Sequence, residues 1–213
     1  RQRQMCIRDR TLTLQNKSNC MLRLKLPTDP RWVDIAEKNI NEILTDHAYC
    51  EQKAASSAIS FIVQYPEYPE LVDAMAALAK EEMEHFEMVH DQIKKRGYDL
   101  GRERKDNYVA ELRKFFKGGD RKRQLVDSLL LAAMIEARSC ERFRVLSEGL
   151  VEPELKAFYA ELMKSEAMHY TMFLSFARDI GGEILDVDKK WSDFLDYEAE
   201  VIQQFGAKEE IHG

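Results

Sequence analysis

The chain has 213 residues, of which 45% are hydrophobic and 33% are charged, and its formal net charge is −6. This composition is typical of a globular protein of one domain, and no run approaches the roughly 18 apolar residues of a membrane-spanning helix. Nine glycines and five prolines are too few for a turn-rich all-β fold, and four cysteines without a Cys-x-x-Cys pair argue against a zinc ribbon or a disulfide framework and favour a reduced, cytoplasmic location.

Residues 1–20 differ from the rest of the chain. They do not begin with methionine, show no amphipathic period and lack the apolar core of a secretory signal. We therefore interpret 1–20 as a disordered or artefactual extension, and 21–213 as a single helical domain that starts at Met21.

Helical periodicity dominates the remainder, and no segment alternates with the period of a strand. Thr28 and Asp29 followed by Pro30 are a helix start signal, and the first apolar period ends before Pro66. Periodicity and such signals predict helices at 30–65, 70–97, 107–116, 121–147, 153–180 and 190–204. Two pairs of long helices joined by a long connection indicate a four-helix bundle with a crossover between helices two and three and an extra C-terminal helix.

An E-x-x-H motif occurs on the second and the fourth long helix with matched surroundings. Each copy, at 82–85 and 166–169, has a solitary glutamate about 30 residues upstream, on the preceding helix. One glutamate from each of two helices plus E-x-x-H from the other two is the ligand set of di-iron and di-manganese carboxylate bundles. Carboxylates with two imidazoles suit iron or manganese better than zinc or copper(I). The candidate ligands are Glu51, Glu82, His85, Glu136, Glu166 and His169.

Helical phase separates these residues from two other E-x-x-H matches, at 87–90 and 209–212. The candidate glutamates lie in apolar stripes, whereas the face neighbours of Glu87 are charged, and 209–212 lies in the C-terminal tail. Buried carboxylates need a basic partner or a metal, and no lysine or arginine occupies the inner positions of the stripes. The sequence therefore favours a metal centre over a structural cluster.

Three other residues near the motif have ordinary alternatives. His47 lies one turn before Glu51 on the same helix face, so it either supports the site or is a hydrogen-bonded core histidine. Cys50 and Cys140 are expected to serve as packing residues.

Four segments around the candidate ligands resemble the tRNA-(2-methylthio-N6-isopentenyladenosine) hydroxylase family, the MiaE-like proteins, of the ferritin-like superfamily. They are TDHAYCEQKAASSA at 45–58, LAKEEMEHFEMV at 78–89, MIEARSCERF at 134–143 and SEAMHYTMF at 165–173. The similarity extends over about residues 22–205. It implies a ferritin-like di-iron monooxygenase that hydroxylates the isopentenyl group of a modified adenosine in tRNA, using O₂ and electrons from an external donor such as a ferredoxin. It also implies that two irons are held by the six candidate ligands, with Glu82 and Glu166 as bridges.

The stretch from 94 to 123 carries twelve basic and five acidic residues. On charge alone it is a solvated surface loop, but the resemblance suggests that it binds tRNA phosphates. The candidate contacts are Lys94, Lys95, Arg96, Arg102, Arg104, Lys105, Arg113, Lys114, Lys117, Arg121, Lys122 and Arg123. A quinone-ring hydroxylase or an iron-oxidising storage protein would share the ligand layout, so both stay as alternatives at this stage.

Overall fold

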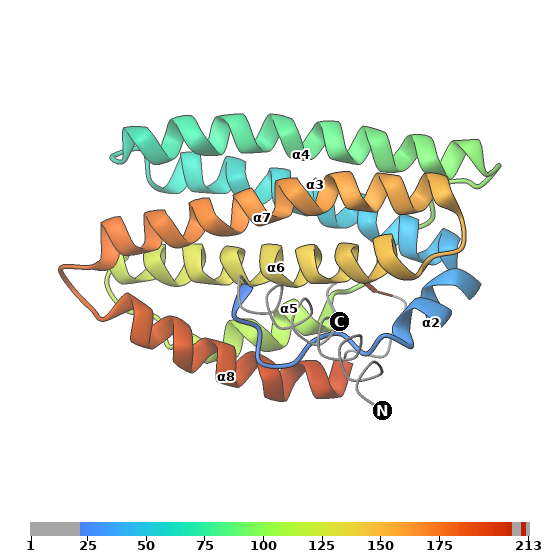
Figure 1. Cartoon of the computed structure of the whole chain (residues 1–213). Helices are drawn as coiled ribbons and strands as arrows, with labels where there is room; N and C mark the ends of the chain where they lie inside the picture. The colour runs from blue at the N-terminus through green and yellow to red at the C-terminus, as the bar shows by residue number, and fades with distance from the viewer. Residues whose placement is uncertain (1–21, 206–209, 212–213) are drawn as a thin grey trace, which may run out of the picture.

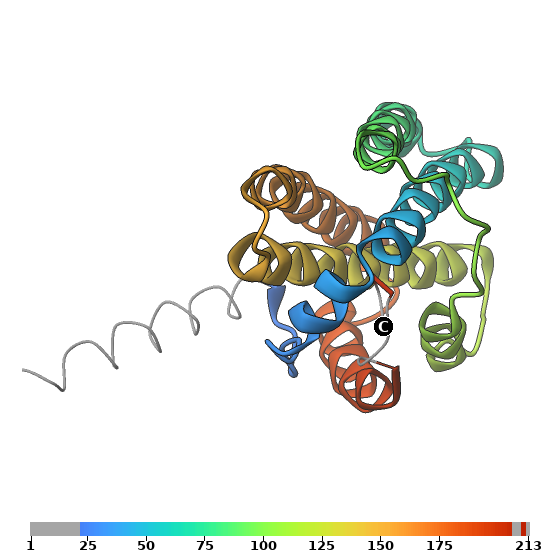
Figure 2. The same cartoon turned by 90° about the vertical axis from the view of Figure 1, so that its right-hand side faces the viewer.

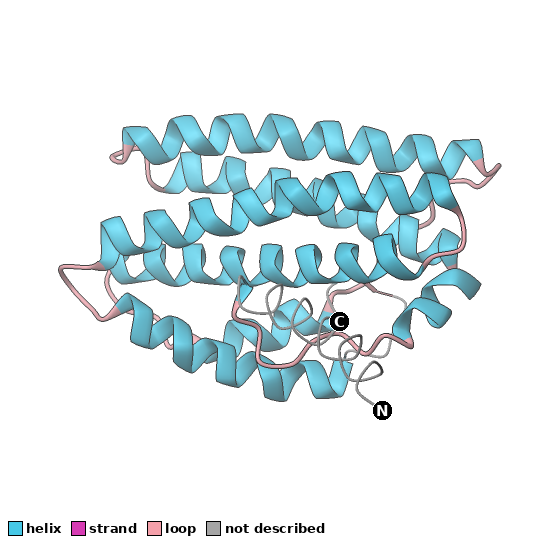
Figure 3. Ribbon diagram, viewed as in Figure 1, coloured by secondary structure: helices cyan, strands magenta, loops and turns pink. Residues whose placement is uncertain are grey.

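The computed structural model describes residues 22–205 and 210–211 (Figure 1). Helices and their connecting loops make up this described part, which contains no strand (Figure 3). The helices are α2 (Trp32–Lys38), α3 (Ile40–Gln64), α4 (Pro69–Lys95), α5 (Asn107–Leu112), the 3₁₀ helix η1 (Arg113–Phe115), α6 (Arg121–Gly149), α7 (Pro153–Gly181) and α8 (Val187–Phe205). The predicted all-α class is confirmed, and the extension predicted at 1–20 lies outside the described residues.

Two helix hairpins form the bundle, because α3 packs along α4 and α6 packs along α7 (Figures 1 and 2). Short turns join the helices of each hairpin, and a proline opens the second helix of each, Pro69 in α4 and Pro153 in α7. The crossover from α4 to α6 contains α5 and η1. The two hairpins face each other along two seams, one between α3 and α6 and one between α4 and α7 (Figures 1 and 2).

Side-chain caps explain where α5 and α6 begin. Asp106 accepts a hydrogen bond from the backbone nitrogen of Val109 at 2.8 Å and starts α5, and Asp120 accepts one from Arg123 at 3.0 Å and starts α6. The predicted helix at 30–65 is divided at Asn39, whose φ of −128° and ψ of 37° are not helical. The Asn39 side chain donates instead to the carbonyl oxygen of Ile35, the competition typical of asparagine within a helix.

A second layer covers the face of α6 that points away from the bundle. It contains α5, α8 and the segment before α2, and it buries a charged network that the sequence did not predict (Figure 1). Arg138 and Glu198 are both 0% exposed, with Nη2 and Oε1 2.5 Å apart, and Tyr108 Oη donates to the same Glu198 oxygen at 2.8 Å. The Arg142 guanidinium lies 4.0 Å from the ring centroid of Trp32. Since buried ions are costly unless paired, this network orients α8 and α5 on α6.

The described helices include none with the length and apolar character needed to cross a bilayer.

Candidate metal centre

The six candidate ligands converge at the middle of the bundle. Their exposed fractions lie between 1% and 6%. Two overlapping groups, each with ligand atoms within 4.8 Å of one another, account for all six. The first group is Glu51, Glu82, His85 and Glu166, and the second is Glu82, Glu136, Glu166 and His169. Glu82 and Glu166 belong to both groups and therefore occupy the centre of the cluster.

Local helix geometry orients the histidines toward the carboxylates. In E-x-x-H the two side chains lie on adjacent turns of one face, and His85 Nδ1 is 3.4 Å from Glu82 Oε2. His169 reaches across from α7, with Nδ1 3.1 Å from Glu82 Oε1 and 3.9 Å from Glu136 Oε2. Both imidazoles thus present Nδ1 to the acidic centre, the arrangement that leaves this nitrogen available as a ligand.

Electrostatics show how unfavourable this cluster is for protein groups alone. Burial, together with the negative charge of neighbouring glutamates, raises the pKa of Glu51 and of Glu166 well above 4.5. Burial opposes ionisation of Glu82 as well, but the imidazoles of His169 and His85 and a hydrogen bond with Glu51 outweigh it and lower its pKa. Burial also opposes charge on His169, yet the glutamates around it raise its pKa to about 9.

The donor set fits a pair of divalent cations. Among the described residues, the ion-pair partners of Glu51 and Glu82 are histidines, and Glu166 has none. Glu166 Oε1 is buried without a hydrogen-bond partner. Two cations would neutralise the carboxylates and bind both imidazoles, and this mixture of hard oxygen and imidazole donors suits iron. The structure thus brings the six residues into an arrangement that fits a di-iron centre.

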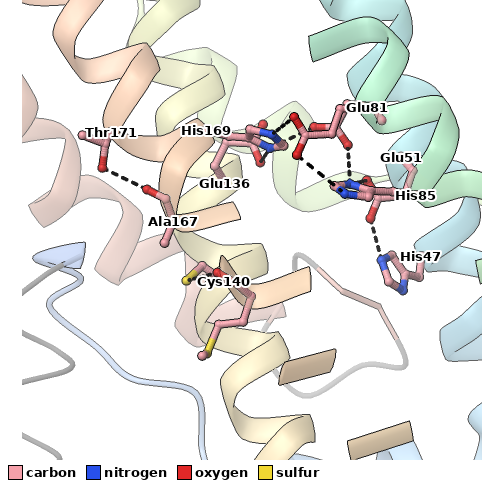
Figure 4. A network of polar contacts seen from close by, with 11 residues as sticks. His47, Glu51, Glu81, His85, Glu136, Cys140, Ala167, His169 and Thr171 are labelled. Atoms are coloured by element: carbon pink, nitrogen blue, oxygen red, sulfur yellow. Dashed lines mark hydrogen bonds and ion pairs between the residues drawn. The ribbon is translucent and has the colours of Figure 1, made fainter. Parts of the chain in front are cut away.

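His47 contacts the candidate ligand that lies one turn further along α3. It is 0% exposed, and its Nε2 lies 2.5 Å from Glu51 Oε1 (Figure 4). Tyr159 stacks on the imidazole at 5.5 Å between ring centroids, and Phe143 packs at 4.7 Å. Both alternatives predicted for His47 are therefore combined, because a packed core histidine holds the carboxylate of Glu51.

Glu81 lies beside both candidate histidines and was missed by the sequence analysis. Its Oε2 is 3.3 Å from His169 Nε2, and its Oε1 is 3.9 Å from His85 Nε2, so one carboxylate faces the outer nitrogen of each ring (Figure 4). Metal-binding histidines usually donate the other ring N–H to such a group, which fixes the tautomer and the ring orientation. The i, i+4 spacing from His85 was the available signal, but the contact with α7 is visible only in the fold.

We expect Glu81→Gln to weaken metal binding without unfolding the protein, because the neutral amide removes the negative charge that faces the outer nitrogens of both imidazoles. Loss of such a supporting carboxylate typically costs about 10- to 100-fold in metal affinity. Titration of the metal-free protein with Co²⁺, followed by its visible absorption, measures the change. Glu84→Gln is the matched control, since Glu84 is exposed on the same helix and pairs with Lys80. Equal Co²⁺ affinity in the two variants would contradict this role for Glu81.

The other E-x-x-H matches do not join the cluster. Glu87 is exposed on α4, and the ring of His90 packs on Phe86 with 5.9 Å between centroids. Glu209 and His212 lie outside the described residues. Cys50 and Cys140 are buried, and burial raises the pKa of both thiols, to about 12 for Cys140. Such thiols are unreactive, in keeping with the packing role predicted for them.

The twelve basic residues predicted to bind phosphates fall into two groups, those with an acidic partner and those without one among the described residues. Eight of them form ion pairs, among them Arg96 with Glu152 and Lys95 with Glu154 at the start of α7. Within the part of the chain that the structure describes, the four without an ion pair are Arg102, Lys105, Arg113 and Lys117. Because an acidic neighbour cancels much of a cation's field, these four are the most available to an anionic partner.

Comparison with solved structures supports the fold. A solved structure described as "Protein 43 with aldehyde deformylating oxygenase activity from Synechococcus" superposes with a TM-score of 0.79 and 32% identity, covering 89% of this chain and 95% of that one. This similarity confirms the predicted ferritin-like bundle.

Two sequence relatives and a family model indicate the family of this chain. A protein of Pseudomonas putida named tRNA 2-(methylsulfanyl)-N(6)-isopentenyladenosine(37) hydroxylase is 41% identical over 160 residues, which is 75% of this chain and 77% of that protein. A Salmonella typhimurium protein of the same name is 28% identical over 228 aligned positions, covering 84% and 83%. The family model described as tRNA-(MS2IO6A)-hydroxylase (MiaE) matches residues 15–213. A match over nearly the whole chain, together with these relatives, establishes that this protein belongs to the MiaE family.

Proposed function

We propose that this protein is a non-haem di-iron monooxygenase that hydroxylates the isopentenyl group of 2-methylthio-N6-isopentenyladenosine in tRNA. The observation that carries the proposal is the buried cluster of four glutamates and two histidines in a chain of this family. Both named relatives carry the corresponding activity in their names. A tRNA substrate supports a cytoplasmic location, which we propose for this protein.

The residues of the cluster have separate tasks in this proposal. Glu82 and Glu166 would bridge the two irons, because each belongs to both ligand groups. Glu51 with His85 would complete one metal site, and Glu136 with His169 the other. Bound iron would supply the activation of O₂ that oxidation of an allylic C–H bond requires. His47 contacts Glu51, and the carboxylate of Glu81 faces the outer nitrogens of both imidazoles, so these residues would orient the ligands before substrate arrives.

Electrons must come from outside the chain. The sequence has no glycine-rich fingerprint for a flavin or a nicotinamide, and the two buried cysteines are too unreactive to replace one. We therefore propose an external donor, such as a ferredoxin.

The test is direct conversion of substrate. Iron-loaded protein, a chemical or ferredoxin reductant, O₂ and tRNA bearing the isopentenylated adenosine are expected to yield the hydroxylated nucleoside, measured by mass spectrometry of digested tRNA. Deletion of the gene is expected to remove the hydroxylated nucleoside from cellular tRNA and to accumulate its precursor. Glu87→Gln, which changes the exposed E-x-x-H pair, should behave as wild type. Unchanged nucleosides after deletion, together with no conversion by the loaded protein, would refute the proposal.

A further inference from the structure

Two cavities lie along the two seams between the hairpins, and each is lined by at least one candidate ligand. The first, of about 520 Å³, lies between α3, the crossover and α6, and Glu136 forms part of its wall. The second, of about 530 Å³, lies between α4 and α7 and reaches His85 and Glu81. Either volume is in the usual range for a small-molecule site, roughly 300–1,000 Å³. We compare the charged and the apolar residues that line the two cavities to infer which of them admits the modified nucleotide.

Charge favours the seam between α3 and α6. Its lining carries Lys53, Lys105 and Arg113 against Glu103, Asp106 and the candidate ligand Glu136, so the formal charges balance, and Lys53 pairs with Glu103. The lining of the cavity between α4 and α7 is negative, with Lys80 against Glu81, Glu84 and Glu161. Since a polyanion approaches the more positive opening, tRNA is steered toward the first seam.

The lining of the first cavity also suits the apolar isopentenyl group, which is attached to a polar base. Its apolar residues include Leu78, Val109, Ala132, Ile135 and Phe173, which line the same cavity as Glu136. A neighbouring hollow of about 240 Å³ shares Ser57, Arg113, Ala132 and Ile135 with it and adds polar side chains, among them Ser60, Gln64 and Ser128. The more apolar cavity, which includes Glu136, is the inner chamber, and the more polar hollow that adjoins it and includes no candidate ligand is the outer chamber.

Arg113 stands where the two chambers meet. It lines both of them, it is exposed, and it has no ion-pair partner among the described residues. Of the four such cations in the basic stretch, only Lys105 and Arg113 line the first cavity. A guanidinium at this junction is positioned for a phosphate that links a nucleotide in the inner chamber to a neighbour in the outer one.

We propose that tRNA docks over the seam between α3 and α6, that the isopentenyl group enters the inner chamber toward Glu136, and that Arg113 binds the phosphate between the modified nucleotide and its neighbour. This inference rests on the proposed function, because it names the entrance and a phosphate contact for the same reaction. It also narrows the twelve predicted phosphate contacts to the two that border the cavity, Lys105 and Arg113.

The entrance is tested by filling each cavity in turn. Ala132→Leu extends a side chain into the first cavity, and Ala77→Leu makes the same change in the second. With iron-loaded protein and a prenylated anticodon stem-loop, Ala132→Leu is expected to lower kcat/KM roughly 10- to 100-fold, whereas Ala77→Leu stays near wild type. Iron content and melting temperature should be the same for both variants, which separates obstruction from misfolding. Loss of activity in Ala77→Leu but not in Ala132→Leu would overturn the assignment.

The phosphate contact is tested at the surface, where substitution leaves the core intact. Arg113→Glu and Lys80→Glu make the same charge change at the two mouths. Arg113→Glu is expected to weaken stem-loop binding and to reduce the slope of log Kd against log salt concentration by about 0.7–0.9, one phosphate contact, while Lys80→Glu keeps the wild-type slope. Equal slopes in the two variants would refute the role of Arg113. If wild-type protein binds the stem-loop and iron but converts no substrate, the proposed reaction is refuted. The salt dependence of stem-loop binding by Arg113→Glu and Lys80→Glu still tests which face of the protein binds tRNA.

Discussion

Replacing Glu166 by glutamine is expected to abolish metal loading and hydroxylation while making the metal-free protein more stable. Glu166 belongs to both ligand groups, so its loss removes a donor from each metal site. In the metal-free protein burial, together with the charges of three neighbouring glutamates, raises the pKa of this carboxyl, and one of its oxygens lacks a hydrogen bond. A neutral amide of the same shape avoids that repulsion, and we expect a gain of about 1–3 kcal/mol in the free energy of unfolding.

Metal analysis and denaturant unfolding check the two halves of this prediction separately. Wild-type protein should bind two equivalents of iron or Mn²⁺, and Glu166→Gln should bind much less under the same conditions. The control is Glu87→Gln on the exposed face of α4, which should change neither quantity. A metal-free variant less stable than metal-free wild type would show that Glu166 contributes structural contacts that outweigh its electrostatic cost.

The pH dependence of stability is expected to have opposite signs with and without metal. His169 has a pKa raised from 6.5 to about 9, so the stability it contributes is fully present below pH 6.5 and is lost as pH rises toward 9. Glu51 and Glu166, whose pKa values are raised above 4.5, act in the same direction. Metal-free protein should therefore lose stability between about pH 6.5 and 9, by about 3 kcal/mol from His169 alone.

Metal reverses this trend because protons compete with it for the ligands. As pH rises, the carboxyls and imidazoles lose their protons, metal binds more tightly, and the bound state is stabilised by mass action. Melting temperatures from about pH 6 to 9, with and without Mn²⁺, test the prediction; the metal-free curve should fall while the loaded curve is flat or rises. Glu166→Gln should flatten the metal-free curve. Parallel curves would mean that the cluster does not couple proton release to metal binding.

Features carried by a single helix were predictable from the sequence. The E-x-x-H pairs at 82–85 and 166–169 define one helix face by themselves, because three residues make nearly one turn. The apolar stripes placed Glu51 and Glu136 on buried faces, and the start and stop signals located the long helices to within a few residues. The break at Asn39 was missed because a single polar residue within a continuous apolar period is a weak signal.

Contacts between helices were beyond sequence reasoning because they depend on how distant segments pack. In the sequence Glu81 is indistinguishable from the surface glutamates of α4. In the fold, α7 places His169 Nε2 3.3 Å from its carboxylate. The sequence pattern of Arg138 and Glu198 is that of solvated charges. In the fold, α8 covers the outer face of α6, and the two residues form a buried ion pair. The sequence by itself determined the helices and the six candidate ligands, since both follow from periodicity along one chain segment. Only the tertiary structure decided which acid faces the outer nitrogens of the two histidines and which of the twelve cations border a cavity, since those depend on the relative placement of helices far apart in the chain.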